Sequence, residues 1–335
     1  LRTEVLQVGD QISTSETSIQ EYLDINTQNE YATALIGKWH LSNNAQDPSS
    51  MGIDYFAGLL QGGVQSYTNW NLVENGQSTT SSEYTTTKFT DLAINWVEDQ
   101  TKPWFLWLAY NAPHTPFHLA PSNLHSQGNL PSYDGSIDAN PLPYFLSAVE
   151  AMDHEMGRLL NSLTPEEIAN TIIIFIGDNG TPNRVTQLPY VTMRSKGSIY
   201  QGGINVPMVI SGLGVNRMGE REAAFIHTTD LFATIAEISG VSIQEINNSK
   251  SFYDLLSNPN ATKREFVYTE RSQNGVSYAI RNSSYKLIVH ENGGQEFFNL
   301  FVDPYETNDL IGTTLSSSAL SAKIDLELEA IIIRM

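Results

Sequence analysis

The chain has 335 residues, 40% of them hydrophobic, and its 37 acidic and 18 basic residues give a formal net charge of −19. This length can bury the core of one large α/β domain with a smaller one attached. The acidic balance, without any basic cluster, argues against nucleic acid and anionic membranes as partners. The absence of cysteine excludes disulfides, zinc–thiolate sites and thiol nucleophiles within this sequence.

No apolar run is long enough to span a bilayer, and the first four residues, Leu1-Arg2-Thr3-Glu4, are not a secretory signal. The low charged fraction, 16%, and the many Ser, Thr, Asn and Gln residues are typical of proteins outside the cytoplasm. We therefore expect a periplasmic or secreted protein whose signal is not in this sequence. The oligomeric state cannot be read from the sequence.

The first predicted elements are a helix and a strand. The pattern Ser13-Thr14-Ser15-Glu16 is that of a capping box and predicts a helix over roughly 16–28. Residues 31–36 predict a buried strand that ends at Gly37, followed by Lys38 and His40. If the chain stays extended, these two side chains point to one side and could bind an anion and move a proton. The alternative is a surface lysine beside a half-buried histidine.

The next stretch, 52–70, is aromatic and loop-rich; it could line a pocket, although aromatic residues on loops more often serve packing, and Ser66 is a candidate substrate-binding residue. Apolar residues at helical spacing from Phe89 to Val97 then predict an amphipathic helix. A buried strand over 104–110 follows.

This strand leads into Ala112-Pro113-His114-Thr115-Pro116. Two prolines fix the backbone around His114, which suits a ligand or an acid/base group and is unnecessary in a solvated loop. His114 is therefore a candidate catalytic residue. His118 lacks such bracing and is expected to be structural. A polar loop over 120–140 and a long helix over about 145–160 complete this part.

A second candidate site follows the apolar strand over 171–176, which we expect to be buried on both faces. Its end delivers Asp178 and Asn179. Hard oxygen donors at the carboxyl end of a strand indicate a Ca²⁺ site, or less readily a Mg²⁺ site. The alternative is an ordinary Asp-Asn-Gly turn.

Arg194 and Lys196 lie in a loop with glycines at 197, 202 and 203, which permit close approach of the backbone to an anionic ligand. The spacing is not that of a nucleotide-binding loop. A strand over 206–210 and a helix over about 229–239 follow. Strands over 266–269, 276–281, 285–289 and 296–300 then predict an antiparallel meander, and 315–332 a terminal helix.

These elements predict an α/β fold: a mostly parallel sheet sandwiched by helices, with a small antiparallel C-terminal subdomain. We place the main domain at 1–257 and the subdomain, with its terminal helix, at 258–335.

Read together, the motifs resemble the sulfatase family of the alkaline-phosphatase superfamily, in the same order along most of the chain. The resemblance rests on Gly37-Lys38-Trp39-His40-Leu41, Gly52-Ile53-Asp54-Tyr55-Phe56, Ala112-Pro113-His114-Thr115-Pro116, Gly177-Asp178-Asn179-Gly180 and Arg194-Ser195-Lys196-Gly197. Tyr285-Lys286-Leu287 and the segment 298–308 resemble the family's closing strands.

The resemblance implies hydrolysis of sulfate esters at a Ca²⁺ site, with a formylglycine as nucleophile. Lys38 and Lys196 would bind sulfate oxygens, with Arg194 and Ser66 as further substrate-binding candidates. His114 would assist departure of the leaving group, and His40 the breakdown of the hemiacetal. Asp178 and Asn179 would be metal ligands.

The sequence departs from the family pattern because it contains no Cys/Ser-x-Pro-x-Arg motif and no paired aspartates near its start. We expect the N-terminal segment with the nucleophile to be upstream, on a partner chain or lost, and this chain alone to be inactive. The expected function is hydrolysis of a sulfated carbohydrate or small sulfate ester. The alternatives are a phosphodiester or phosphonate monoester hydrolase, and a non-catalytic glycan- or anion-binding relative.

Overall fold

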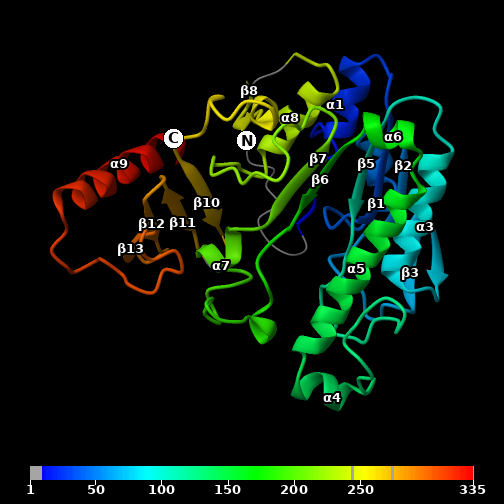
Figure 1. The fold of residues 1–335 in the computed structure, drawn as a ribbon, viewed down its shortest axis with the longest axis horizontal. Coiled ribbons are helices and arrows are strands. Elements are labelled where there is room, and N and C mark those ends of the chain that lie inside the picture. The colour runs from blue at the N-terminus through cyan, green and yellow to red at the C-terminus, as the bar shows by residue number, and fades with distance from the viewer. Residues whose placement is uncertain (1–9, 243–244, 273–274, 335) are drawn as a thin grey trace. The chain divides into compact units, whose positions relative to one another are not determined.

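The computed structural model describes residues 10–242, 245–272 and 275–334, which fall into two compact units (Figure 1). The first unit comprises the described residues of Leu1–Asn170 and Phe232–Ser251, and the second those of Thr171–Leu231 and Phe252–Met335. The predicted domain boundary between residues 257 and 258 stays a prediction.

The first unit is built on a five-stranded sheet with the order β4-β3-β2-β1-β5. Its strands are β1 (Ala32–Lys38), β2 (Tyr55–Leu59), β3 (Trp70–Glu74), β4 (Gln77–Ser81) and β5 (Trp104–Ala109). β1 runs parallel to both β2 and β5, whereas β3 and β4 are added to β2 as an antiparallel hairpin. The parallel centre places the ends of β1 and β5 at one edge, where the polar segments that follow them begin.

Helices cover both faces of this sheet, as the sequence predicts for an α/β fold (Figure 1). On one face, Ala34 and Ile36 of β1 pack against Phe89 and Ala93 of α3. On the other, Phe105 of β5 packs against α1 and α8. The helices and short strands of this unit are α1 (Ile19–Asn26), α2 (Asp47–Ser50), α3 (Thr85–Glu98), α4 (Asp134–Ala139), α5 (Leu142–Ser162), α6 (Pro165–Asn170), most of α8 (Asp230–Ile238), β8 (Glu245–Ile246) and β9 (Ser249–Lys250).

Two local predictions in this unit are wrong. The cap of α1 is Ser18, whose Oγ accepts the N–H of Glu21 at 3.0 Å, and the expected capping box at 13–16 is instead a turn. The Ser18 hydroxyl also donates to the carbonyl of Met51 at 2.6 Å, a tertiary contact that favours this residue as the cap. The expected loop over 52–70 contains β2, a strand that is almost wholly buried.

The second unit contains β6 (Ile172–Ile176), paired antiparallel with β7 (Met208–Gly212), and a separate four-stranded antiparallel sheet. The predicted strand over 171–176 is confirmed, but it is half-buried instead of fully buried on both faces. The other elements are η1 (Asn183–Val185), α7 (Gln201–Ile204), η2 (Tyr253–Leu256), β10 (Val267–Arg271), β11 (Ser277–Arg281), β12 (Tyr285–Val289), β13 (Gln295–Asn299) and α9 (Ser317–Arg334).

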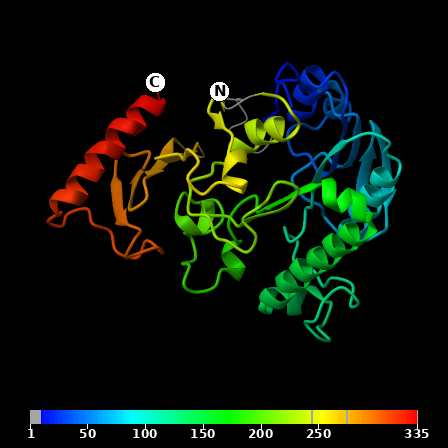
Figure 2. The same cartoon turned by 45° about the horizontal axis from the view of Figure 1, so that its top comes forward.

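The four-stranded sheet is the predicted C-terminal meander, with β10 to β13 paired in chain order. Figure 2 shows α9 lying along it, and Ala319, Leu326 and Ala330 of this helix pack on Ile280 and Leu287 of the sheet. The described helices include none that is long and apolar enough to cross a lipid bilayer.

A buried ion pair lies inside the second unit. Lys286 of β12 is 0% exposed and Glu306 is 1% exposed, and Nζ and Oε1 are 2.5 Å apart. Burial lowers the pKa of Lys286 to about 8, and the Glu306 carboxylate opposes this shift, so the lysine remains charged at neutral pH. Two buried charges are tolerated because each neutralises the other.

We expect Glu306→Gln to lower the free energy of local opening around β12 by about 3–5 kcal/mol, since it leaves the Lys286 ammonium buried without its counter-charge. Amide hydrogen exchange of β12 measures this energy. The double variant Lys286→Met/Glu306→Gln should lose much less than the sum of the two single losses. Additive losses, or a loss no larger than that of Lys263→Met in a surface pair with Glu222, would contradict a stabilising buried pair.

Candidate functional site

The predicted site residues form two groups. Lys38, His40, Ser66 and His114 belong to the first unit, whereas Asp178, Asn179, Arg194 and Lys196 belong to the second. Each group is described within its own unit.

Lys38 is the last residue of β1, and the chain beyond it continues along β2. The N–H of Trp39 donates to the carbonyl of Leu59 at 2.8 Å, and that of His40 to the carbonyl of Leu60 at 3.0 Å. His40 has a φ of +55°, a conformation that is uncommon for a residue other than glycine. The sheet therefore fixes the backbone that carries both side chains.

Two consecutive glycines receive the imidazoles of His40 and His114. A Cβ atom on Gly62 would lie 2.4 Å from Cε1 of His40, and one on Gly63 would lie 3.2 Å from Nδ1 of His114. Only a residue without a side chain lets the His40 ring pack this closely on the backbone. The segment 62–63 thus brings together two predicted site residues that are far apart in sequence. Our sequence reasoning missed this role, although a Gly-Gly pair shortly after a strand is a recognisable signal.

The environment of His40 makes it a neutral base. Burial, followed by the positive charge of Lys38 and the neighbouring His114, holds the pKa of His40 below its ordinary value of 6.5. His40 is exposed overall, and its ring packs against the backbone at Gly62. A neutral imidazole at pH 7 can accept a proton.

His114 is held by its backbone. Its N–H donates to the carbonyl of Asn111 at 2.9 Å, and its carbonyl accepts the hydroxyl of the buried Tyr67 at 2.6 Å. The ring Nδ1 lies 2.9 Å from the carbonyl of Thr115. A carbonyl can only accept, so in the neutral ring Nδ1 carries the proton and Nε2 is the basic nitrogen.

His118 and Ser66 have local structural partners. His118 stacks on Tyr67 with centroids 3.7 Å apart, and its Nε2 lies 2.9 Å from the hydroxyl of Tyr84. Burial lowers its pKa to about 4, so it is a neutral packed side chain, as expected. The Oγ of Ser66 accepts the N–H of Thr68 at 3.2 Å in a tight turn. Its role in substrate binding stays a prediction.

In the second unit, the turn after β6 packs on the loop that carries Lys196. The N–H of Gly180 donates to the carbonyl of Gly203 at 2.9 Å, and the N–H of Lys196 donates to the carbonyl of Thr181 at 3.0 Å. A Cβ on Gly180 would lie 1.9 Å from the oxygen of Gly202, so glycine is required there. These contacts place the Asp178 turn and the Lys196 loop next to each other.

Asp178 and Asn179 are both exposed at the end of β6, and the Asn179 amide donates to Oδ1 of Asp178 at 2.8 Å. A carboxylate and a carboxamide side by side are the hard oxygen donors that Ca²⁺ takes, and they fit two of its six to eight ligands. Over the described ranges, no group of three or more His, Cys, Asp or Glu side chains could hold a metal ion. Their role as metal ligands stays a prediction.

Arg194 and Gln201, at the two ends of the loop with Lys196, both bind Glu306. Arg194 donates to the Glu306 carbonyl, and the N–H of Gln201 donates to the Glu306 carboxylate at 2.5 Å. The Arg194 guanidinium also lies 4.4 Å from the ring centroid of Tyr200. These contacts give Arg194 a structural role, and its predicted contact with substrate stays a prediction. Sequence reasoning gave no hint of the part played by Glu306.

The sequence matches two protein-family models. A family model described as Sulfatase matches residues 4–241, and one described as N-sulphoglucosamine sulphohydrolase, C-terminal, matches residues 193–333. The uncharacterized sulfatase YdeN of Escherichia coli K12 is 30% identical over 249 residues, which cover 64% of this chain and 42% of that protein. Mouse arylsulfatase J is 28% identical over 234 residues, covering 64% and 38%. The chain spans about half the length of the curated relatives it matches.

Solved structures share the fold. The structure of Ps i-CgsB in complex with k-i-k-neocarrahexaose has a TM-score of 0.78 at 24% identity, covering 96% of this chain and 74% of that one. The structure of BT4656 in complex with its substrate D-glucosamine-2-N,6-O-disulfate has a TM-score of 0.77 at 21% identity, covering 99% and 84%. This similarity supports the alkaline-phosphatase-like α/β architecture.

We expect Gly62→Ala to displace the His40 ring, because the new Cβ would overlap it, and to raise the pKa of His40 towards 6.5 as water reaches the imidazole. NMR titration of histidine Cε1–H signals measures this pKa. Gly157→Ala in α5, where an added Cβ meets nothing within 4 Å, is the control. A pKa of His40 that is the same in Gly62→Ala and the parent protein would refute the packing described here.

Proposed function

Because the chain belongs to the sulfatase family, we propose that it is part of a sulfuric ester hydrolase acting on a sulfated carbohydrate or small sulfate ester. The observation that supports this most is that the family match over residues 4–241 includes both groups of site residues, from Lys38 to Lys196. The Ps i-CgsB and BT4656 complexes and the similarity to an ulvan-active sulfatase, 25% identical over 309 residues, favour a carbohydrate.

The two lysines serve as the cations for the sulfate oxygens. Lys38 is the last residue of the inner strand β1, and Lys196 lies in a loop whose two ends are both bound to Glu306. In a chain of net charge −19, fixed local cations are needed to attract an anionic group. Positive charge aimed at the transferring group also stabilises the charge that develops on it in the transition state.

The two histidines move protons. His114 presents Nε2 as the basic nitrogen, because Nδ1 is bound to the Thr115 carbonyl, and a proton taken up there can pass to the leaving oxygen. His40, with its lowered pKa, is neutral at pH 7 and serves as a base. The depressed pKa also predicts that this base is protonated at a lower pH than an ordinary histidine.

The proposal also includes a Ca²⁺ ion and a formylglycine nucleophile, which are not among the described residues. Asp178 and Asn179 would hold Ca²⁺, which would supply further positive charge, and a formylglycine would supply the nucleophile. No Cys and no Ser in an x-Pro-x-Arg context is present in these 335 residues, so we propose that the nucleophile comes from outside them.

We expect Lys38→Ala and Lys196→Ala, made separately in the intact gene product, each to lower kcat/KM on 4-nitrophenyl sulfate by roughly 10²-fold. Removing either cation leaves developing negative charge unmatched. Lys102→Ala and Lys263→Ala remove surface lysines from the same two units and are the matched controls. If both test variants keep the activity of the controls, the lysines do not bind the reacting sulfate.

A further inference from the structure

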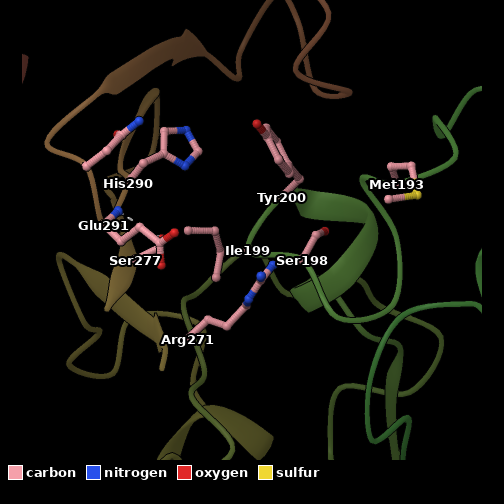
Figure 3. Close-up of a pocket in the computed structure, with 9 residues that line it drawn as sticks. Met193, Ser198, Ile199, Tyr200, Arg271, Ser277, His290 and Glu291 are labelled. Carbon is pink, nitrogen blue, oxygen red and sulfur yellow. Dashed lines mark hydrogen bonds between the residues drawn. The ribbon is translucent and has the colours of Figure 1, made fainter. Parts of the chain in front are cut away.

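A pocket of about 290 Å³ lies within the second unit, next to the loop that carries Lys196 (Figure 3). Its walls come from the segment 193–200, from the facing ends of β10 and β11, and from the turn between β12 and β13. Figure 3 shows His290 and Glu291 on one side and Tyr200 on the other. None of the roles assigned above uses this pocket.

The apolar part of the lining is firmly held. Ile199 is 5% exposed and packs in the core of the meander with Ile288 and Phe298. The Tyr200 hydroxyl donates to Glu296, and the Arg194 guanidinium covers its ring. These contacts give the pocket an apolar floor and one aromatic wall, which do not need to be ordered when a ligand binds.

The polar part of the lining both donates and accepts hydrogen bonds. Arg271 donates to the carbonyl of Gly197 at 3.0 Å. This bond uses one of the five N–H donors of the guanidinium group. Ser277 Oγ accepts the N–H of Glu291 at 3.2 Å, so its own proton can point elsewhere. Asn292 Oδ1 accepts the N–H of Gly294 at 2.9 Å, and its amide still has donors to offer. The Glu291 carboxylate supplies acceptors.

The charges of the lining balance. Arg271 brings one positive charge and Glu291 one negative charge, and the ring of His290 is bound to Glu296 with Nε2 2.8 Å from Oε1. The lining carries no net charge and offers both hydrogen-bond donors and acceptors. It therefore suits neutral hydroxyl groups, each of which donates and accepts, better than it suits a negatively charged second sulfate. The volume lies at the small end of the range for ligand pockets, about 300–1,000 Å³, and suits one ring.

The pocket adjoins Lys196 through the chain itself, because Arg271 binds the carbonyl of Gly197, the next residue. We propose that this pocket binds a neutral, hydroxyl-bearing sugar ring of a sulfated saccharide substrate, with Arg271 as its principal hydrogen-bond donor. The inference rests on the proposed function only in assigning the ring to the substrate of the same enzyme.

Binding is tested on the intact gene product with two sulfate-free probes, galactose and N-acetylglucosamine, by amide chemical-shift mapping. We expect at least one probe to shift the amides of 198–200 and 290–294. Arg271→Ala should weaken this binding roughly 10-fold, the loss of a strong hydrogen bond. Asn292→Trp should also weaken it, because a much larger side chain at a lining position would take up space in the pocket. Arg221→Ala, at an exposed arginine, is the control.

A kinetic comparison completes the test. Both pocket variants should raise KM for a sulfated oligosaccharide that also carries a sulfate-free ring, while leaving KM for 4-nitrophenyl sulfate, which has no sugar, within about twofold. The proposal is overturned if neither probe shifts these amides, if the variants bind like the control, or if inorganic sulfate displaces the sugars. If the parent enzyme releases sulfate neither from such an oligosaccharide nor from 4-nitrophenyl sulfate, the proposed function fails, whereas the mapping still reports on the pocket.

Discussion

The second unit depends on the ion pair between Lys286 and Glu306. Both side chains are almost fully buried, so neither charge can be solvated and each requires the other. The backbone of Glu306, at a φ of +59°, also turns its carbonyl to Arg194 while its carboxylate binds the N–H of Gln201. One residue therefore fixes both ends of the loop with Lys196 and joins that loop to the meander.

In the first unit, backbone packing holds the candidate site residues in place. Its sheet fixes the backbone around Lys38 and His40, and the Gly62-Gly63 segment packs on the rings of His40 and His114. The consequence is electrostatic as well as geometric, since burial, the charge of Lys38 and the neighbouring His114 hold the pKa of His40 below its ordinary value. In both units the candidate site residues are exposed or half-buried, whereas Tyr67, Gln201 and Glu306, which bind the segments that carry them, are buried. This division of roles is what a preorganised site requires.

The sequence predicted elements with strong periodicity. The apolar spacing in α3 and α5 and the apolar runs of β1 and β5 are local properties, and all four elements are present. The hairpin of β3 and β4 was missed although Asn75-Gly76, with φ values of +45° and +81°, is a strong hairpin signal. β2 was missed because it is short and Gly58, a residue that is depleted in strands, interrupts its apolar run.

The site was only partly predictable, for a physical reason. Motifs identify side chains with chemical potential, such as Lys38 or Asp178, but a positioning contact joins residues far apart in sequence. The bonds of Glu306 to Arg194 and Gln201 span more than 100 residues, and the pairing of β6 with β7 depends on a strand over 30 residues away. Neither can be read from one segment alone.

The central claim is that these residues serve hydrolysis of a sulfate ester, and the intact gene product tests it most directly. A sulfate monoester carries one negative charge and a phosphate monoester up to two, so an acidic protein with few local cations should favour the sulfate. We therefore predict a higher kcat/KM on 4-nitrophenyl sulfate than on 4-nitrophenyl phosphate at pH 7. Equal or faster hydrolysis of the phosphate, or no release of sulfate at all, would contradict the account.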